Sequence, residues 1–263
     1  MDNPNYTSKD LALAKNLFVM NLKDRHLGSM LGITWAIMQP LMMLMVYTFV
    51  FGFLMKSRAP GSETTLDYVI WMICGLGPWI AISEAIVSGA NSIWTYSNLI
   101  KSVPMKKELV VISSAAVSIV PLLVTMVFVF LLMIYQGTYP SWHAIYLLPC
   151  IFLQYIFVIC VTIYLSPLVL FIRDLTHIIP NLLMLVMFLT PIFYSVERIP
   201  GIYKQITACN PIYIITDGYR AALVRSESPS FFPMFALFIL GSVALYLGIK
   251  IFRKLQGHFD SAL

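Results

Sequence analysis

The chain has 263 residues, of which 59% are hydrophobic and only 11% charged, with a mean hydropathy of +0.83. A soluble domain carries about 25% charged residues, so this composition excludes an ordinary soluble domain and indicates an integral membrane protein. The net charge of +5 does not indicate nucleic-acid binding, because the basic residues flank apolar runs, where they set membrane topology.

The first 31 residues predict an amphipathic helix at the cytoplasmic face of a membrane. Apolar residues recur there at three- and four-residue spacing and form a stripe of Leu11, Ala14, Phe18 and Leu22. The lysines fall largely off that stripe, at Lys9, Lys15 and Lys23. Before a membrane span, such a helix lies in the interface with its lysines toward anionic headgroups. The alternative is a soluble cap helix.

Apolar runs of about 20 residues predict six membrane-spanning helices. They are Ile33–Leu54, Tyr68–Val87, Leu109–Tyr135, Ile145–Phe171, Ile178–Tyr194 and Phe231–Phe252. The predicted fold class is therefore an all-α integral membrane protein with a single domain over residues 1–263. In that division, residues 33–194 hold five spans, 195–230 an outer segment, 231–252 the last span and 253–263 a cytoplasmic tail.

The loop between the second and third spans predicts a docking surface for a cytoplasmic protein. Residues 91–98 can form a short helix, and Pro104 breaks the chain after it. Trp94 and Tyr96 suit a membrane–water boundary, and lysines follow. The alternative is a simple interfacial turn.

The distribution of lysine and arginine predicts that both termini are cytoplasmic. With the N-terminus inside, most of the 17 basic residues fall in inner segments, as the positive-inside rule requires. The contrary charges concentrate in residues 195–230, which are too charged for a span and too apolar for an ordinary loop. That segment is therefore predicted to lie on the outer side.

The sequence contains no motif for energy conversion or catalysis. The sequence lacks a phosphate loop, a G-x-S-x-G elbow and an H-E-x-x-H helix, so we predict that the chain is not an enzyme. It also lacks a paired Cys/His set, and its four cysteines lack CxxC spacing, so we predict no metal site. Glu84 is the clearest charge within a span; it is either structural, which we favour, or near the inner mouth of a pathway. The pattern favours a half-transporter that dimerises and takes its energy from another chain.

Five stretches of the sequence are distinctive when taken together. The first is "NLKDRHLGSMLGITWAIMQPLMMLMVYTFVFG", and "SNLIKSVPMKKELV", "FIRDLTHIIPNLLMLVMFLTPIFYSVERIP", "NPIYIITDGYRAAL" and "FRKLQGHFDSAL" follow in order. They closely resemble the type-2 ABC exporter permeases that export O-antigen, capsule or teichoic-acid polymers. The match covers essentially the full length. His26 departs from the aromatic residue that the family more often has there.

The resemblance implies a complex of two permeases and two nucleotide-binding ATPase subunits in the bacterial inner membrane. ATP and magnesium would bind the ATPase, so this chain would hold no cofactor, and its substrate would be an undecaprenyl-diphosphate-linked polysaccharide, most simply O-antigen. The loop after the second span would be the coupling helix, with candidate residues Asn91, Trp94, Tyr96, Asn98 and Lys101. Residues 195–230 would be a re-entrant helical pair at the outer mouth.

Pro200 and Pro211 of the outer segment predict the breaks that bound this pair, roughly Gly201–Cys209 and Ile212–Val224. Each helix is too short to span, and backbone that dips into a membrane survives only inside protein or beside a wet cavity. The candidate outer-gate residues are Pro200, Tyr203, Pro211, Tyr213 and Arg220.

Aromatic residues on the first and fifth spans predict the lining of the channel, because rings contact sugar faces without fixing one register. The candidates are Trp35, Gln39, Tyr47, Phe51, Met184, Phe188 and Tyr194; lipid or helix packing is the alternative for each. Lys23 and Arg25 are candidates for contact with the lipid diphosphate or with headgroups.

Two further function classes stay open. A type-2 permease for a small lipid or drug would enclose a cavity rather than a continuous channel. A membrane-embedded glycosyl- or phospho-transferase would need clustered acidic or metal-binding residues, which the sequence does not display.

Overall fold

The computed structural model describes residues 6–25, 30–55, 64–198 and 200–259, and every regular element within these ranges is helical. His26, Lys56 and Arg58 lie outside them. The elements are α1 (Ser8–Asp24), α2 (Trp35–Tyr47) with its π-helical continuation η2 (Thr48–Leu54), α3 (Thr65–Thr95), α4 (Ser97–Ser102), α5 (Glu108–Ala116), α6 (Ile119–Gln136), α7 (Leu147–Phe171), α8 (Leu175–Leu189), α9 (Gly201–Ala208), α10 (Pro211–Arg220) with π-helical η5 (Ala221–Arg225), and α11 (Phe231–Leu255). Short 3-10 turns lie at Gly32–Thr34, Trp142–Tyr146, Val196–Arg198 and Gln256–His258.

Five stretches in the described ranges are long and apolar enough to cross a membrane. They are Trp35–Leu54, Thr65–Thr95, Glu108–Gln136, Trp142–Phe171 and Phe231–His258, and they confirm five of the six predicted spans. The remaining span, predicted over Ile178–Tyr194, is not confirmed as a helix of that extent: α8 has 15 residues, or about 22 Å against a hydrocarbon core of about 30 Å. Its helix ends before Pro191, because proline forces the preceding Thr190 into extended backbone (ψ 135°).

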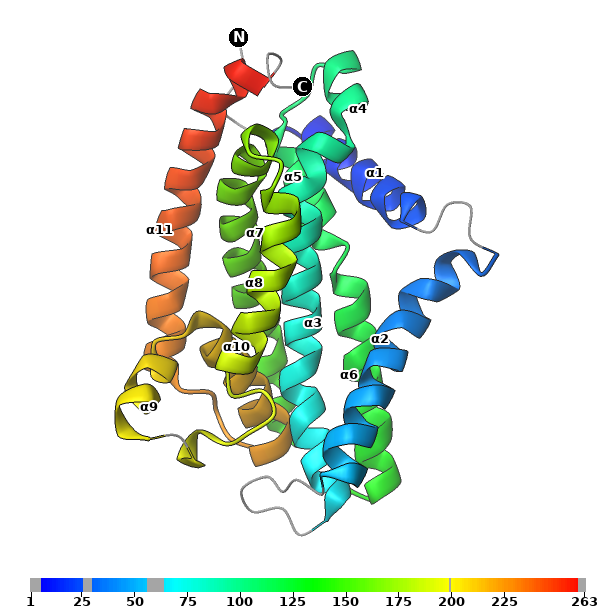
Figure 1. The fold of residues 1–263 in the computed structure, drawn as a ribbon, viewed down its shortest axis with the longest axis vertical. Coiled ribbons are helices and arrows are strands. Elements are labelled where there is room, and N and C mark those ends of the chain that lie inside the picture. Colours follow the sequence, from blue (N-terminus) through cyan, green and yellow to red (C-terminus); the bar gives the residue numbers. More distant parts are fainter. Residues whose placement is uncertain (1–5, 26–29, 56–63, 199, 260–263) are drawn as a thin grey trace.

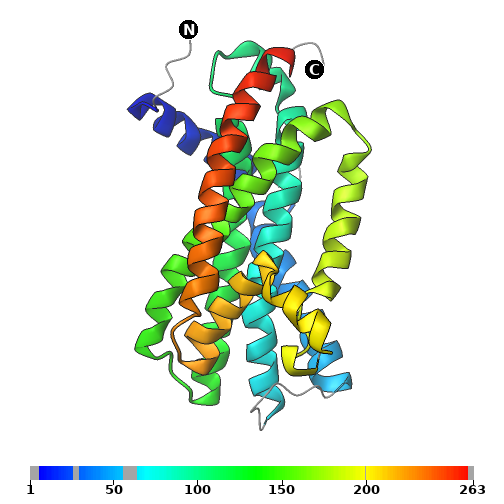
Figure 2. The ribbon, with the colours of Figure 1, turned by 90° about the vertical axis from the view of Figure 1, so that its left-hand side faces the viewer.

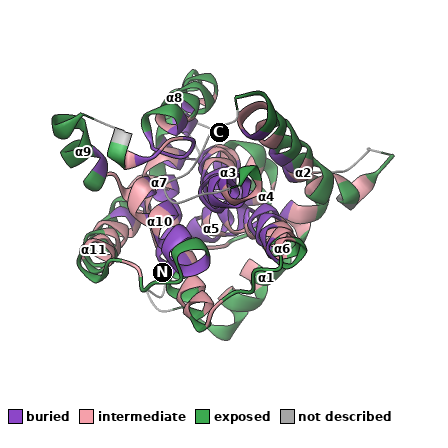
Figure 3. Ribbon diagram, turned by 90° about the horizontal axis from the view of Figure 1, so that it is seen from below, coloured by how far each residue is buried: buried purple, intermediate pink, exposed green. Residues whose placement is uncertain are grey.

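The long helix α3 forms the centre of the molecule, and the other helices stand around it (Figures 1 and 2). Viewed along the bundle, α3 is buried on all sides, whereas the outer helices are exposed on one face (Figure 3). This agrees with its sequence, which is apolar all round rather than along one stripe. Small residues bring neighbouring helices close: Gly77 lies against Thr125 of α6, and Gly89 lies against Thr162 of α7.

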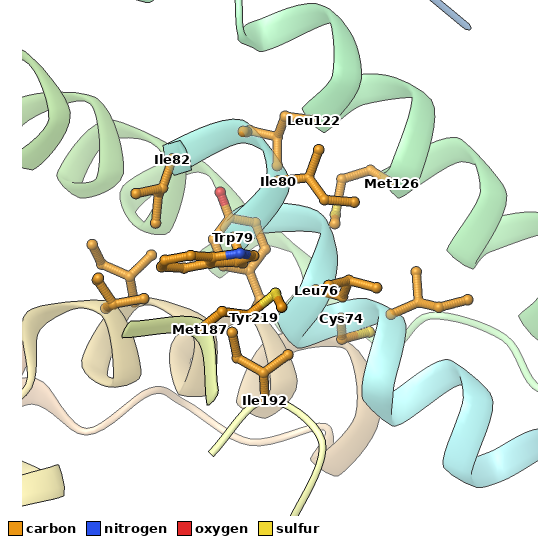
Figure 4. Packing of buried hydrophobic residues seen from close by; sticks show 14 of the residues in the cluster. Cys74, Leu76, Trp79, Ile80, Ile82, Leu122, Met126, Met187, Ile192 and Tyr219 are labelled. Atoms are coloured by element: carbon orange, nitrogen blue, oxygen red, sulfur yellow. The ribbon is translucent and has the colours of Figure 1, made fainter. Parts of the chain in front are cut away.

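The core of the bundle is built where α3 meets α6, α8 and α10 (Figure 4). Trp79 of α3 lies among Met187 of α8, Ile192 of the segment after α8, and Tyr219 of α10. The side chain of Tyr219 is fully buried. The Tyr219 hydroxyl donates a hydrogen bond to Oε1 of Gln154 at 2.8 Å, which satisfies a polar group that could not remain unpaired at this depth.

The chain after α8 is non-helical yet buried. Residues Thr190 to Phe193 are all buried, so their carbonyl groups have no access to water. Side chains of other elements satisfy them: Arg220 donates to the carbonyls of Pro191 (2.8 Å) and Ile192 (2.6 Å), and the Tyr68 hydroxyl donates to that of Phe193 (2.9 Å). Irregular backbone at membrane depth is stable only where protein surrounds it in this way.

Arg220 is the central residue of this arrangement. It is 2% exposed, its Nε donates to the carbonyl of Trp71 at 3.2 Å, and its guanidinium lies 3.7 Å from the centroid of the Trp71 ring. Gly75 makes room for it, because a Cβ there would lie 2.9 Å from Arg220 Cζ and closer still to Nη2. One side chain of α10 therefore joins α3 to the break after α8.

We expect Gly75→Ala to destabilise the protein by about 1–3 kcal/mol, because the added methyl group displaces the guanidinium from its three carbonyl acceptors. Thermal unfolding of the detergent-purified protein measures this. Gly241→Ala is the matched control, since a Cβ there meets only the Ile156 side-chain methyl at 3.2 Å. Equal unfolding midpoints for the two variants would contradict the role assigned to Arg220.

Candidate functional site

The C-terminal end of α2 with η2, and the end of α8 with the segment after it, meet in an aromatic cluster of Tyr47, Phe51, Phe188 and Phe193. The Phe193 ring centroid lies 4.5 Å from that of Phe51, 5.1 Å from Tyr47 and 5.9 Å from Phe188. The structure thus brings together three of the residues proposed from sequence as channel lining. It also adds Phe193, which helical periodicity does not identify because the residue lies in the non-helical segment beyond Pro191.

Of the other proposed lining residues, Tyr194 touches this cluster through Phe188, whereas Trp35, Gln39 and Met184 are not part of it. Trp35 and Gln39 belong to the opposite end of α2, where Gln39 lines a cavity. Met184 is 60% exposed on α8, and the Tyr194 hydroxyl donates to the carbonyl of Phe188 at 2.9 Å, which caps the end of that helix. The set is therefore divided between two levels of the bundle.

The exposed faces of α2 and α8 differ from those of the other long helices in their polar content. Gln39 on α2 and His177 and Asn181 on α8 are exposed. In contrast, the exposed residues of α6, of α7 and of α11 as far as Leu247 are apolar except for the tyrosines Tyr135 and Tyr246. Side chains that face lipid are apolar, whereas polar side chains within a span turn toward a protein partner or water. The face formed by α2 and α8 is therefore the one unsuited to lipid.

The N-terminal half of α2 borders a cavity of about 280 Å³ whose lining includes an ion pair. Arg25, just after α1, pairs with Glu84 of α3, and its other terminal nitrogen donates to the Ser114 carbonyl at 3.4 Å. The pair explains the one clear intramembrane carboxylate, because a charge at this depth needs a partner. Lys23, the second candidate for contact with phosphate, is exposed.

The short helix of the predicted docking loop is α4, at Ser97–Ser102, and not residues 91–98. The helix α3 continues to Thr95 because nothing breaks it earlier, and the chain bends at Tyr96 (φ −103°, ψ 27°). Ile100 packs inward, whereas Asn98 and Lys101 are exposed on the opposite side. The structure therefore leaves one polar face of α4 accessible.

The remaining docking candidates are engaged within the chain to different extents. Trp94 is 40% exposed and lies under the Arg173 guanidinium at 4.1 Å, a cation–π contact. Asn91 donates to the Val87 carbonyl at 2.8 Å. The Tyr96 hydroxyl reaches Asp24 at 3.4 Å, and burial, with a smaller effect of Asp24, raises the pKa of Tyr96 to about 12.

The helix α1 packs against α5 through Leu17 and Asn21, its two buried residues. Of the predicted apolar stripe, Ala14 packs beside Leu17 on the same apolar cluster, whereas Leu11 is 75% exposed. The Asn21 amide oxygen accepts a hydrogen bond from Ser114 at 3.0 Å, so a polar pair fixes the contact. The placement of the stripe in a membrane interface stays a prediction.

The proposed outer-gate residues do not form one surface. Arg220 lies inside the bundle, so it does not line an opening, and this part of the prediction is corrected by its burial. Pro211 and Tyr213 are partly buried on α10, whereas Pro200 and Tyr203 are exposed at α9. The two short helices predicted here are confirmed as helices, with α10 capped by Asn210, whose side chain accepts from the Ile212 amide at 2.9 Å.

Comparison with known proteins finds relatives that match over nearly the whole chain. The chain is 26% identical over 250 residues to the O-antigen export system permease protein RfbA of Myxococcus xanthus, with 94% of each chain covered. It is 28% identical over 244 residues to an O-antigen export system permease protein RfbA of Klebsiella pneumoniae, with 92% of each covered. A third relative is the polysialic acid transport protein KpsM of Escherichia coli, 21% identical over 252 residues, with 90% of this chain and 91% of that protein covered.

The model of the ABC-2 type transporter family matches residues 14–224, a range that includes α2 to α10 and most of α1. This range holds the aromatic cluster, the Arg25–Glu84 pair and the Arg220 contacts. The chain therefore belongs to the ABC-2 type transporter family.

Proposed function

We propose that this chain is the permease subunit of an ATP-driven exporter that moves a polysaccharide on an undecaprenyl-diphosphate carrier, with O-antigen the favoured substrate, across a bacterial inner membrane. The observation that carries the proposal is the aromatic cluster beside the polar face of α2 and α8. Aromatic rings contact sugar C–H faces, and the face that holds them is unsuited to lipid. The names of the relatives agree in substrate class.

Two copies of the chain enclose the channel in this proposal. The span that begins with α2 is 17% buried, against 89% for α3 and 11% for α11, so the polar residues of its face, and not its exposure, separate it from the lipid-facing helices. An exposed face that carries Gln39 and Asn181 needs a partner or water, and a second copy placed against α2 and α8 supplies both. The exposed α6, α7 and α11 faces then meet the lipid.

The crossing that starts with α8 is completed by the buried segment after it, which gives six crossings and a re-entrant pair, α9 and α10. One contact supports this topology. Arg253 at the end of α11 donates to the Tyr6 hydroxyl at 3.3 Å, so both described ends of the chain lie at one side. That side also holds α4, where we place the ATPase subunits, with ATP and magnesium bound to them.

We expect Tyr47→Ala, Phe51→Ala and Phe188→Ala each to reduce export roughly two- to tenfold, because each removes one aromatic contact with the moving glycan. The measurement is ATP-dependent delivery of lipid-linked polysaccharide into the lumen of inverted vesicles that contain the permease and its ATPase. Phe235→Ala and Phe238→Ala, on the exposed apolar face of α11, are the matched controls. The proposal fails if all three cluster variants export as well as these controls.

The pairing of Arg25 with Glu84 leads us to expect a structural role for this arginine, with headgroup contact left to Lys23. Arg25→Met leaves a carboxylate without its partner and lowers the stability by about 1–2 kcal/mol, because the pair is only partly buried. The double variant Arg25→Met/Glu84→Met regains the unfolding midpoint and exports normally. A double variant that is stable but does not export would instead assign Arg25 to the lipid diphosphate.

The exposed face of α4 predicts the ATPase contact. Lys101→Glu reverses a charge there and weakens recovery of the ATPase subunit in affinity purification by about tenfold, without altering the permease's own stability. Lys254→Glu, an exposed lysine at the same end but on α11, is the control and leaves recovery unchanged. Equal recovery with both variants would remove α4 from the interface.

A further inference from the structure

Three parts of the chain that are remote in sequence meet behind α4. They are the N-terminal arm (Tyr6–Asp10), the end of the docking loop (Lys106–Glu108) and the last turn of α11. Glu108 opens α5 directly after the docking loop, and its side chain is 1% exposed. It therefore depends on a partner, because a buried carboxylate without one is strongly destabilising.

That partner is Arg253 of α11. Two nitrogens of its guanidinium approach the same oxygen of Glu108, Nη2 at 2.7 Å and Nε at 2.8 Å. The Tyr6 hydroxyl donates to this oxygen at 3.4 Å and accepts from Arg253 at 3.3 Å. The three side chains form a closed set, so the end of α11 cannot separate from the start of α5 without leaving a buried charge unpaired.

Adjacent contacts strengthen this junction. Lys106 pairs with Asp10 at 2.8 Å, and this hydrogen bond, with that from the Thr7 amide, lowers the pKa of Asp10 to about 2, so the carboxylate is charged at physiological pH. Lys107 donates to the Gln256 carbonyl at 3.3 Å. Beneath them lies an apolar cluster that includes Ile100 of α4 and, from the end of the chain, Phe252 and Phe259. The inward face of α4 thus contacts the same cluster as α11.

The helix α11 extends from this junction to the outer side of the bundle. Along the way it packs closely on α7: Gly248 lies against the Tyr164 ring, and the Tyr164 hydroxyl donates to the Ala244 carbonyl at 2.8 Å. At its outer end, Met234 lies against Gly218 of α10. A rigid helix therefore connects the cytoplasmic junction to the outer segment.

We propose that Glu108 and Arg253 are positioning residues that transmit displacement of the ATPase-bound docking loop to α11 and, through α11, to α10. The inference rests on the proposed function, because it requires an ATPase on α4. It goes further by assigning the last helix to the element that responds to ATP. Energetic coupling between distant sites passes through rigid elements and ion-pair networks of this kind.

The experiment follows the outer end of α11 in the complete complex of permease and ATPase. A spin label at Ser230→Cys, in a cysteine-free background, reports the distance between the two copies with and without ATP and magnesium. Arg253→Met leaves Glu108 unpaired and lowers stability. Glu108→Gln/Arg253→Met removes both charges, so we expect its unfolding midpoint to return toward that of the unsubstituted protein. Lys250→Met removes a cation three residues earlier on α11, and serves as the matched control.

We expect the double variant to bind the ATPase normally but to show an ATP-induced change in distance reduced roughly three- to thirtyfold, while Lys250→Met keeps the full change. An undiminished change in a stable double variant overturns the inference and leaves the proposed function intact. If the unsubstituted permease fails to bind the ATPase at all, the proposed function fails and the inference fails with it. If the double variant regains both the unfolding midpoint and the full ATP-induced change in distance, the pair serves folding alone, which also overturns the inference.

Discussion

The structure depends on the need to satisfy a stretch of non-helical backbone inside the bundle. Carbonyl groups at this depth have no water to bond, and each one left unpaired costs several kcal/mol. Arg220 satisfies two of them together with one on α3, and Tyr68 satisfies a third. Because an arginine remains charged and offers five donors in a fixed plane, one residue can hold three segments together. The positions of α8, α10 and the aromatic Phe193 all follow from this contact.

The need to satisfy buried backbone carbonyl groups also explains why position 75 is a glycine. A helix in lipid gains nothing from burying more apolar surface against another helix, so close backbone approach and polar contacts must hold the bundle together. At Gly75 the approaching group is a guanidinium, and at Gly77 it is a threonine hydroxyl. The two glycines thus serve the same purpose on two sides of α3, which allows one central helix to bind α6 and α10 at once.

Five of the six predicted spans are confirmed, because long apolar runs have one solution in a membrane, a continuous helix. The sixth, Ile178–Tyr194, is not confirmed, because α8 ends before Pro191 and the chain beyond it is held by contacts from Arg220 and Tyr68 that no local pattern reveals. The sequence also predicts Arg220 at a wet mouth, because the charge of an arginine gives no sign of burial. One signal was available, since Ile212, Ile215 and Tyr219 mark the inner face of α10 and Arg220 follows directly.

The candidate site was predicted where it depends on composition and was missed where it depends on tertiary contact. Tyr47, Phe51 and Phe188 stand out as aromatic residues on apolar helices, but only the fold places them around Phe193. Conversely, the contacts between helices divide the bundle into two parts. The helices α3, α7, α10 and α11 contact one another through glycines and buried hydrogen bonds, whereas α2 packs mainly on α6. Segments with few internal contacts open at low cost in free energy. The aromatic cluster lies where α2 meets the segment held by Arg220, so we expect a displacement of α2 to move Tyr47 relative to Phe193.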